Sequence, residues 1–229
     1  MTNVAAAELN YHHYPLAKYD RDIVNAIPFH RELHEQLLAA IEAHFDVNKN
    51  YQVLDLGVGT GLTTELTKNY LPQSTFTVVD FSSKMLQRAK QRLGSANIEY
   101  ILGDYSLLNF DHQYNLVTSV IGLHHQDSAG KRALFKKIYK LLKPGGLFIL
   151  GDLMTSANPH LSAANTAYHY HHLVEQATDE QTLTDWAHHH LFLNQLDTIE
   201  DHQQWLEDAG FKVEVAFQQW NTVLLVCRK

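Results

Sequence analysis

The chain has 229 residues, and its 18 Lys and Arg against 25 Asp and Glu give a net charge of −7. This length suits one domain with an inserted cap, and the acidic balance without a basic stripe excludes nucleic acid as the main partner. Met1–Ala7 lacks the features of a signal peptide, no apolar run approaches the ~20 residues of a membrane span, and Cys227 has no internal disulfide partner. We therefore expect a cytoplasmic protein without membrane association.

Two segments outside the main α/β pattern are expected to be helical. Residues 1–48 should form an N-terminal cap, because apolar side chains in residues 31–45 recur at helical spacing. Residues 155–209 should form a helical insertion in the main domain, residues 49–229. Both segments are expected above the carboxyl ends of the strands, where open α/β sheets bind ligands, and to act as a lid.

The first predicted strand ends in a glycine-rich turn. Tyr51–Leu56 is almost continuously apolar, as in a strand buried on both faces, and a helical pattern begins at Thr60. Gly57 and Gly59 lie between the strand and Thr60, and Gly61 directly follows Thr60. Glycine permits positive φ and close ligand approach, and a helix N-terminus favours an anionic group. The turn therefore indicates a nucleotide cradle.

The spacing of the glycines favours one class of nucleotide ligand. Dinucleotide-binding turns carry G-x-G-x-x-G, whereas the third glycine here comes one residue early. Asp80 ends the second predicted strand, residues 76–80, and lies 19 residues after Gly61, close to the ~20 expected of a ribose-binding acid. This spacing argues against an NAD-dependent oxidoreductase, an alternative that nicotinamide binding would restore.

The remaining pattern predicts a doubly wound α/β sheet. Ser82 is expected to cap a helix that runs to Leu93. Strands and helices then continue to alternate: residues 98–102, 114–121 and 146–150 are predicted strands, and residues 131–142 are a predicted helix. Residues 211–217 and 220–227 form two further strands with only Gln218 and Gln219 between them. Because two residues are too few for a parallel crossover, these strands should form an antiparallel hairpin.

Further motifs carry a resemblance to a known family. They are the glycine turn Asp55–Gly61, the segment Val79–Leu86, the triplet Gly103-Asp104-Tyr105, the pair His124-His125 and the turn Leu142–Gly146. In these motifs the chain, from about Tyr19 to its end, is similar to the class I S-adenosylmethionine (SAM) dependent methyltransferases, specifically to small bacterial and archaeal methyltransferase-domain proteins. The resemblance implies a Rossmann-like seven-stranded sheet of order 3-2-1-4-5-7-6 with strand seven antiparallel. It also implies SAM as cofactor and S-adenosylhomocysteine (SAH) as product.

The resemblance further implies which residues contact SAM. Asp55 and the three glycines would hold its methionine end, Asp80 the ribose and Asp104 the adenine amino group, although a Gly-Asp pair is also a common turn former. The complete set of implied cofactor contacts is Tyr19, Arg21, Asp55, Gly57, Gly59, Thr60, Gly61, Asp80, Phe81, Met85, Gly103, Asp104, Tyr105, Val120, Ile121 and His125.

Three residues are candidates for a catalytic role. The sulfonium methyl is already activated, so an acceptor gains most from proximity and desolvation, and only a protonated acceptor needs a base. His124 and His125 follow strand four, where the family faces the transferred methyl, and either could take the proton; alternatively, the pair packs against SAM or caps the loop. Asp152 follows strand five and could orient an amine or bond to the backbone.

The chain holds 16 histidines, which raise the question of a metal. His169 and His172 could share a helix face, with a third ligand from His188–His190. A solvated lid is the favoured interpretation, because the chain has no cysteine pair and no H-E-x-x-H motif, and we predict no metal site.

The main functional hypothesis is methyl transfer from SAM to N or O of a small-molecule acceptor. The alternative is a noncatalytic SAM-binding partner or sensor protein. The sequence does not identify the acceptor, and it leaves a homodimer open.

Overall fold

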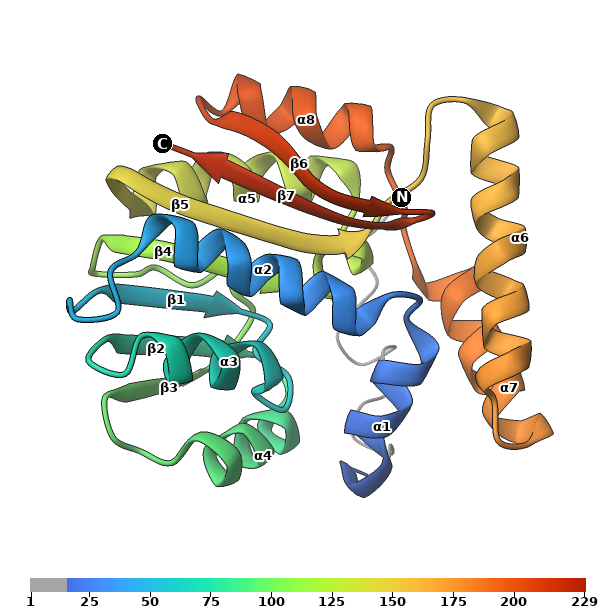
Figure 1. The fold of residues 1–229 in the computed structure, drawn as a ribbon, viewed down its shortest axis with the longest axis horizontal. Coiled ribbons are helices and arrows are strands. Elements are labelled where there is room, and N and C mark those ends of the chain that lie inside the picture. Colours follow the sequence, from blue (N-terminus) through green and yellow to red (C-terminus); the bar gives the residue numbers. More distant parts are fainter. Residues whose placement is uncertain (1–15) are drawn as a thin grey trace.

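The computed structural model of the protein describes residues 16–229 (Figure 1). The start of the expected helical cap, with His12 and His13, lies outside these residues. One sheet of seven strands has the order β3-β2-β1-β4-β5-β7-β6, and β7 is antiparallel to both of its neighbours, which confirms the predicted topology. The strands are β1 (Gln52–Leu56), β2 (Thr75–Asp80), β3 (Ile98–Leu102), β4 (Tyr114–Val120), β5 (Leu142–Leu153), β6 (Lys212–Gln219) and β7 (Thr222–Arg228).

The helices form a layer on each face of the sheet and a third group beyond the strand ends (Figure 1). One face carries α2 (His30–His44), α3 (Leu62–Tyr70) and α4 (Ser83–Leu93), and the other carries α5 (Ser128–Leu141) and α8 (Ile199–Asp208). Beyond the carboxyl ends of β1 and β5 lie α1 (Leu16–Ala26), α6 (Pro159–Gln176), α7 (Glu180–His188) and the π-helix η2 (His189–Leu193). None of the described helices combines the length and the apolar character that a membrane span needs.

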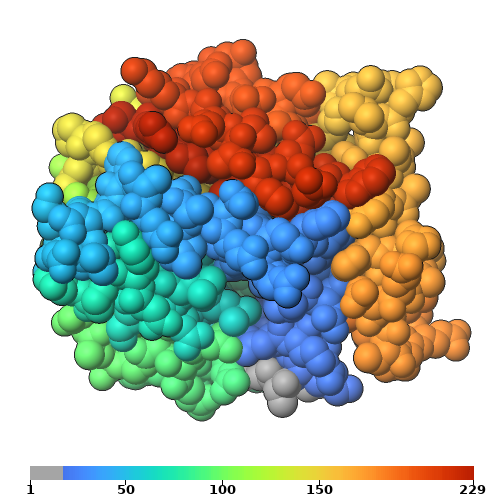
Figure 2. All heavy atoms as spheres, viewed as in Figure 1, coloured from blue at the N-terminus to red at the C-terminus, as the bar shows by residue number. Residues whose placement is uncertain are grey.

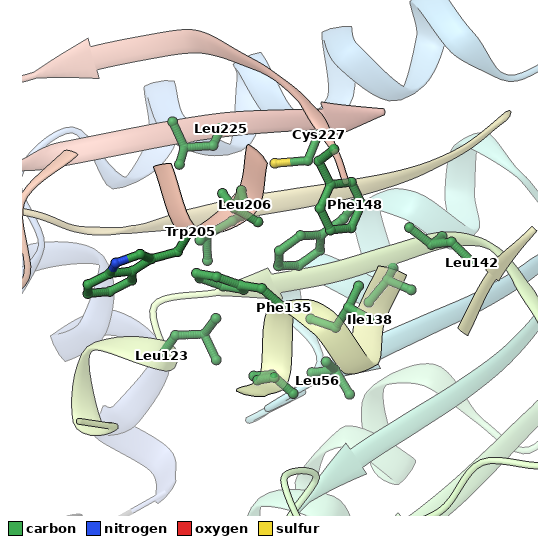
Figure 3. Packing of buried hydrophobic residues seen from close by; sticks show 14 of the residues in the cluster. Leu56, Leu123, Phe135, Ile138, Leu142, Phe148, Trp205, Leu206, Leu225 and Cys227 are labelled. Atoms are coloured by element: carbon green, nitrogen blue, oxygen red, sulfur yellow. The ribbon is translucent and has the colours of Figure 1, made fainter. Parts of the chain in front are cut away.

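The sheet is rigid because both faces are buried under apolar side chains. On the α5 face, Phe135 and Ile138 pack against Phe148 of β5 and Leu206 of α8 (Figure 3). Each of these side chains is fully buried, which stabilises the fold by about 1.5–3 kcal/mol per residue. The sheet thereby fixes the positions of the turns at its carboxyl edge.

The placement predicted for the N-terminal cap is correct for α1 but wrong for α2. Leu33, Leu37 and Ile41 of α2 are fully buried in the cluster that covers the sheet face. An apolar stripe at helical spacing fits a sheet face as well as a strand end, so the pattern did not distinguish them. In contrast, α1 packs against α6, and Asn25 O of α1 accepts a hydrogen bond from His172 Nε2 of α6 at 2.8 Å. Figure 2 shows α1 (blue) and α6 (orange) at the same end of the molecule.

The insertion is also divided between two places. α6 and α7 lie beyond the strand ends, as expected of a lid, whereas α8 covers the sheet face beside α5. Trp205 and Leu206 of α8 are buried in that face, so the last part of residues 155–209 belongs to the core.

Two connections also differ from the prediction. β3 and β4 are joined without a helix, and the Lys137 ammonium of α5 donates to the carbonyl oxygens of Tyr105 and Ser106 in this loop. The β6–β7 turn lies at Trp220 and Asn221 instead of Gln218-Gln219, because β6 continues to Gln219. Trp220 takes a φ of 53° there and stacks on Tyr168 of α6, with ring centroids 4.3 Å apart.

We predict that His30 makes the fold acid-sensitive. Burial lowers the pKa of this imidazole to about 3, and the neighbouring His34 lowers it further in the same direction. Between about pH 7.5 and 5.5 the unfolded chain takes up a proton that the folded chain does not, so the free energy of unfolding falls by about 1.4 kcal/mol from this residue alone. Denaturant unfolding at both pH values should show that His30→Gln reduces the acid-induced loss by this amount.

The matched control for this measurement is His160→Gln, at an exposed position of α6. An acid-induced loss that is equally large in the wild type and in His30→Gln would contradict the role assigned to His30.

Candidate functional site

The glycine turn between β1 and α3 has the backbone conformation of a ligand cradle. Gly57, Gly59 and Gly61 have φ values of 77°, 54° and 90°, a region that L side chains rarely adopt. The N–H groups of Gly57 and Val58 both donate to Val79 O at 2.9 Å, which ties the turn to the end of β2. Among residues 16–229, no atom lies within 4 Å of a Cβ placed on Gly59, so these residues leave this side of the turn open to a ligand.

Asp80 closes the cradle from the neighbouring strand. Its Oδ2 accepts from Gly59 N at 2.9 Å, and its Oδ1 accepts from Ser82 N at 2.8 Å. Burial raises the pKa of Asp80, although these N–H groups act in the opposite direction. The carboxylate therefore lies directly beside the open side of Gly59, where the sequence predicts the ribose of SAM.

Asp55 of β1 connects the strand before the glycine turn to its neighbours β4 and α3. Its carboxylate is buried and accepts from the hydroxyls of Thr118 on β4, at 2.9 Å, and Thr64 on α3. Burial raises its pKa to about 6, against the effect of both hydroxyls. The contacts described here are internal to the protein, so Asp55 fixes the relation of β1, β4 and α3, and its contact with the methionine end of SAM stays a prediction.

A polar clasp fastens α1 over the glycine turn, and sequence reasoning missed it. Thr60 Oγ1 donates to Asp20 Oδ1 at 2.5 Å, and Arg92 of α4 binds both the Asp20 carboxylate and Thr60 O, the latter at 2.8 Å. Asp20 lies between the predicted contacts Tyr19, which is half-buried, and Arg21, which is exposed. The clasp places this segment against the cradle, as expected of a cover.

The residues predicted around the adenine lie along the ends of β2 and β3. Gly103 N donates to Asp80 O at 2.9 Å, Met85 is buried, and Phe81 is half-buried. Asp104 is exposed and accepts from Ser106 N at 2.8 Å, so it is a turn residue in this structure. Its contact with adenine stays a prediction.

Two further predicted contacts flank the cradle. Tyr105 is buried, and its ring lies 3.7 Å from a Cβ placed on Gly57. Ile121, directly after Val120 at the end of β4, has a φ of 52°. Such a conformation is strained for a β-branched residue and is held here by the bond from Ile121 N to Gly151 O, at 2.8 Å. Strain of this kind clusters at functional sites, and it lies immediately before the histidine pair.

Asp152 and His124 form a buried dyad. The imidazole Nδ1 lies 2.5 Å from Asp152 Oδ1, and Oδ2 accepts from the backbone N–H groups of His124, at 3.1 Å, and Leu123, at 2.8 Å. Burial would raise the pKa of Asp152, but the charge and hydrogen bond of His124 outweigh it and lower the pKa. A carboxylate can only accept, so Nδ1 carries a proton, and in the neutral form of the imidazole Nε2 is the nitrogen with the lone pair. Asp152 therefore has the backbone-bonding role that the sequence left as one alternative.

The lid is attached to the same turn. Gln195 N donates to His124 O at 2.6 Å, and the buried Lys131 ammonium of α5 donates to Gln195 O at 2.6 Å and to Asp197 Oδ2 at 2.7 Å. These bonds join residues more than 60 positions apart in the chain. Lys131 and Gln195 are functional supports that no local pattern in the sequence indicates.

This attachment brings a third histidine to the pair. The π-helix η2 places His189 so that its ring centroid lies 5.0 Å from that of His125, which in turn lies 4.1 Å from that of His124. Ligand-capable nitrogen atoms of the three residues lie within 4.8 Å of one another. Part of the predicted combination is brought together: His169 stacks on His190, with ring centroids 3.8 Å apart, and contacts Asn221, whereas His172 reaches α1.

Comparisons with known proteins agree with this geometry. Residues 53–146, from β1 to the start of β5, match the family model described as a methyltransferase domain. A malonyl-[acyl-carrier protein] O-methyltransferase of Priestia megaterium is 32% identical over 116 residues, which are 51% of this chain and 41% of that protein. A carboxy-S-adenosyl-L-methionine synthase of Staphylococcus epidermidis is 27% identical over 207 residues, or 89% of each chain. The match thus spans less than half of the first relative and most of the second.

A solved structure shows the same fold. Human N-acetylserotonin methyltransferase in complex with SAM superposes with a TM-score of 0.58 and 19% identity, over 93% of this chain and 58% of that one. At this identity the likeness shows the fold alone.

We predict opposite phenotypes for two substitutions in the glycine turn. Gly59→Ala should cost the fold only about 1–2 kcal/mol, because its new methyl group enters open space, but that group should weaken SAM and SAH binding by roughly tenfold or more. Gly61→Ala should mainly destabilise the fold, by about 1–3 kcal/mol, because its Cβ would lie 3.0 Å from Leu93 Cδ1. Calorimetric titration and denaturant unfolding separate the two effects. Wild-type affinity in Gly59→Ala would contradict the cradle.

Proposed function

We propose that this chain, which belongs to the class I SAM-dependent methyltransferases, transfers the methyl group of its cofactor SAM to N or O of a small-molecule acceptor. The observation that carries the proposal is the position of the His124–Asp152 dyad relative to the cradle. β1 and β4 are adjacent in the sheet, and Ser119 Oγ donates to Leu56 O at 3.0 Å where both strands end. The turn that holds SAM and the turn that carries the histidines therefore lie side by side at one edge.

The dyad supplies what such a reaction requires of the protein. The acceptor's lone pair forms a bond to the methyl carbon, the carbon–sulfur bond breaks, and its electron pair stays on sulfur to give SAH. A proton that the acceptor N or O loses passes to Nε2 of His124, while Asp152 keeps Nδ1 protonated and stabilises the imidazolium that forms. Proximity and exclusion of water supply the rest of the rate enhancement.

The enclosure of the site favours a small acceptor. His124 is 3% exposed and His125 8%, beneath a lid that Lys131 and Gln195 fasten to the same turn. A macromolecular substrate would have to displace this lid before it reached the methyl group. The acceptor is therefore a molecule that the space between the lid and the strand ends can enclose.

A second candidate function is chemical modification of SAM itself. It is favoured by the match over 89% of both chains to a relative whose name states that it makes carboxy-SAM. Mass spectrometry of the cofactor after incubation distinguishes the two functions: methyl transfer yields SAH, whereas modification yields a heavier sulfonium compound. A noncatalytic SAM-binding protein would return SAM unchanged.

Cofactor binding is the first test of the proposed function. Calorimetric titration of the full chain with SAM and with SAH should show one site for each ligand. Failure to bind either of them would refute the proposal, and binding of a nicotinamide nucleotide in their place would restore the oxidoreductase alternative.

We predict that Asp152→Asn lowers turnover without a matching loss of cofactor affinity. An amide no longer fixes the protonated Nδ1 or stabilises the imidazolium, so kcat should fall by roughly 10²–10⁴-fold, the usual contribution of a positioned base. The assay follows radiolabelled methyl transfer from SAM to a panel of small phenols, carboxylic acids and amines, and SAH affinity is measured in parallel.

Asp185→Asn, at an exposed position of α7, is the matched control and should retain wild-type turnover. If Asp152→Asn lost SAH affinity and kcat by the same factor, Asp152 would have a structural role only.

A further inference from the structure

Residues 156–194 form a lobe whose two ends are joined at one base. The lobe consists of α6, α7 and η2 (Figure 1). Thr155, directly before it, donates its N–H to Asp197 O just beyond its other end, at 3.0 Å. Gln195 N donates to His124 O at 2.6 Å and so holds this base at the edge of the sheet. A segment that is joined at one base can swing as a unit, as hinged lids do.

Beyond the base, hydrogen bonds between the lobe and the rest of the protein use imidazoles. Asn221 Nδ2, in the turn between β6 and β7, donates to His169 Nδ1 of α6 at 2.7 Å. His172 Nε2 donates to Asn25 O of α1 at 2.8 Å. His169 is 2% exposed, so the expectation of a solvated lid is wrong at this position. The closed position of the lobe therefore involves side chains that change charge near neutral pH when they are in water.

His169 and His190 form a stacked pair that requires neutral rings. Their centroids are 3.8 Å apart, with an interplanar angle of 20°. Each Nδ1 accepts from an amide nitrogen, that of Asn221 at 2.7 Å and that of Asn194 at 3.4 Å. An imidazolium carries a proton on both nitrogens. A proton taken up by either ring would therefore replace a hydrogen bond by a donor–donor contact, and protons on both rings would bring two positive charges face to face.

The amide oxygens of the same two asparagines are unsatisfied. Asn194 Oδ1 and Asn221 Oδ1 are buried without a hydrogen-bond partner among the residues that the structure describes. Buried polar atoms without a partner raise the free energy of the state that contains them, and exposure to water removes this cost. The closed lobe is thus held by contacts that open readily once the imidazoles become charged.

The titratable and charged groups around His169, His189 and His190 are mostly further imidazoles. They come from η1 (Leu123–His125), α6 and α7, with one carboxylate and one ammonium behind η1: His124, His125, His172, His188, Asp152 and Lys131. The carboxylate is bound to His124, and the ammonium to Gln195 and Asp197. These groups offer no free carboxylate to a protonated imidazole of the lobe.

Burial also favours the neutral rings. It lowers the pKa of His169 to about 3 and those of His189 and His190 to about 4, and neighbouring imidazoles act in the same direction. An amide oxygen facing His169 would raise its pKa, but the atom of Asn221 at this distance is the nitrogen, which only donates. In water each ring has a pKa of about 6.5. The advantage of the closed lobe is therefore complete above about pH 6.5 and falls about tenfold per ring and pH unit as the pH drops toward 4.

We propose that the lobe is a proton-operated gate over the dyad, closed while His169, His189 and His190 are neutral and swung open about its base when they take up protons. The open gate gives small molecules a path to His124, and the closed gate keeps water away from it. The inference goes beyond methyl transfer and does not rest on it, because it concerns the position of the lobe in the absence of cofactor and acceptor.

A distance measurement between two spin labels tests the gate in the full chain without SAM or acceptor. The labels are attached through Gln176→Cys at the end of α6 and Gln36→Cys on α2, which are exposed positions, while the buried Cys227 stays unlabelled. Pulsed electron paramagnetic resonance at about pH 7.5 and about pH 5.5 gives the ratio of open to closed lobes. We expect the ratio to rise by about 10³-fold at the lower pH, roughly tenfold for each of the three imidazoles.

Two variants of the labelled chain assign this rise to the imidazoles. Asn221→Asp places a carboxylate at His169 Nδ1, so the closed lobe can hold the protonated ring, and His190→Gln removes one titrating group. Each should reduce the acid-induced rise by roughly tenfold. The matched control is His171→Gln, at an exposed position of α6, which should keep the full rise. Equal distances at both pH values in the wild type, or an undiminished rise in both variants, would overturn the proposal.

Discussion

The candidate site depends on one buried carboxylate that must be satisfied by hydrogen bonds. Asp152 is the penultimate residue of β5, the strand that pairs with the antiparallel β7, and it is 1% exposed. An unpaired charge at this buried position would cost free energy of folding. It accepts from the backbone of Leu123, His124 and Leu153 and from the imidazole of His124. The demand of this group for N–H donors thus determines the shape of the turn after β4 and the tautomer of the histidine in it.

The cover over the strand ends is built from two separate parts with different fastenings. On the cradle side, the side chains of Asp20 and Arg92, which are 25% and 14% exposed, connect α1 to the buried Thr60. On the histidine side, Lys131 is fully buried and holds the segment around Gln195 to the turn of the dyad. Contacts with more solvent exposure open at lower cost, so α1 is the part of the cover through which we expect the cofactor to enter.

The sequence predicted what is local and could not predict what depends on docking. The alternation of strands and helices and the closing hairpin followed from short-range signals, namely buried apolar runs, helical spacing and a two-residue connection, whereas the strand order came from the resemblance to the methyltransferase family. Gly59 and Asp80 were predicted from short-range spacing in the same way, and their contact with SAM stays a prediction. The failures concern the face that α2 covers, the clasp between Asp20 and Arg92, and the approach of His189 to the histidine pair. Each of these depends on how segments 60 or more positions apart pack, which periodicity does not encode.

In the proposed mechanism, Asp152 holds His124 as an Nδ1-protonated imidazole whose Nε2 faces the reacting groups. The most direct measurement is ¹⁵N–¹H correlation NMR of histidine-labelled, chelator-treated protein at about pH 8, with the His124→Gln variant used to identify the signals. The account predicts that Nδ1 of His124 is protonated and Nε2 is not, and that Asp152→Asn alters this pattern. Protonation at Nε2 with a bare Nδ1 in the wild type would contradict it.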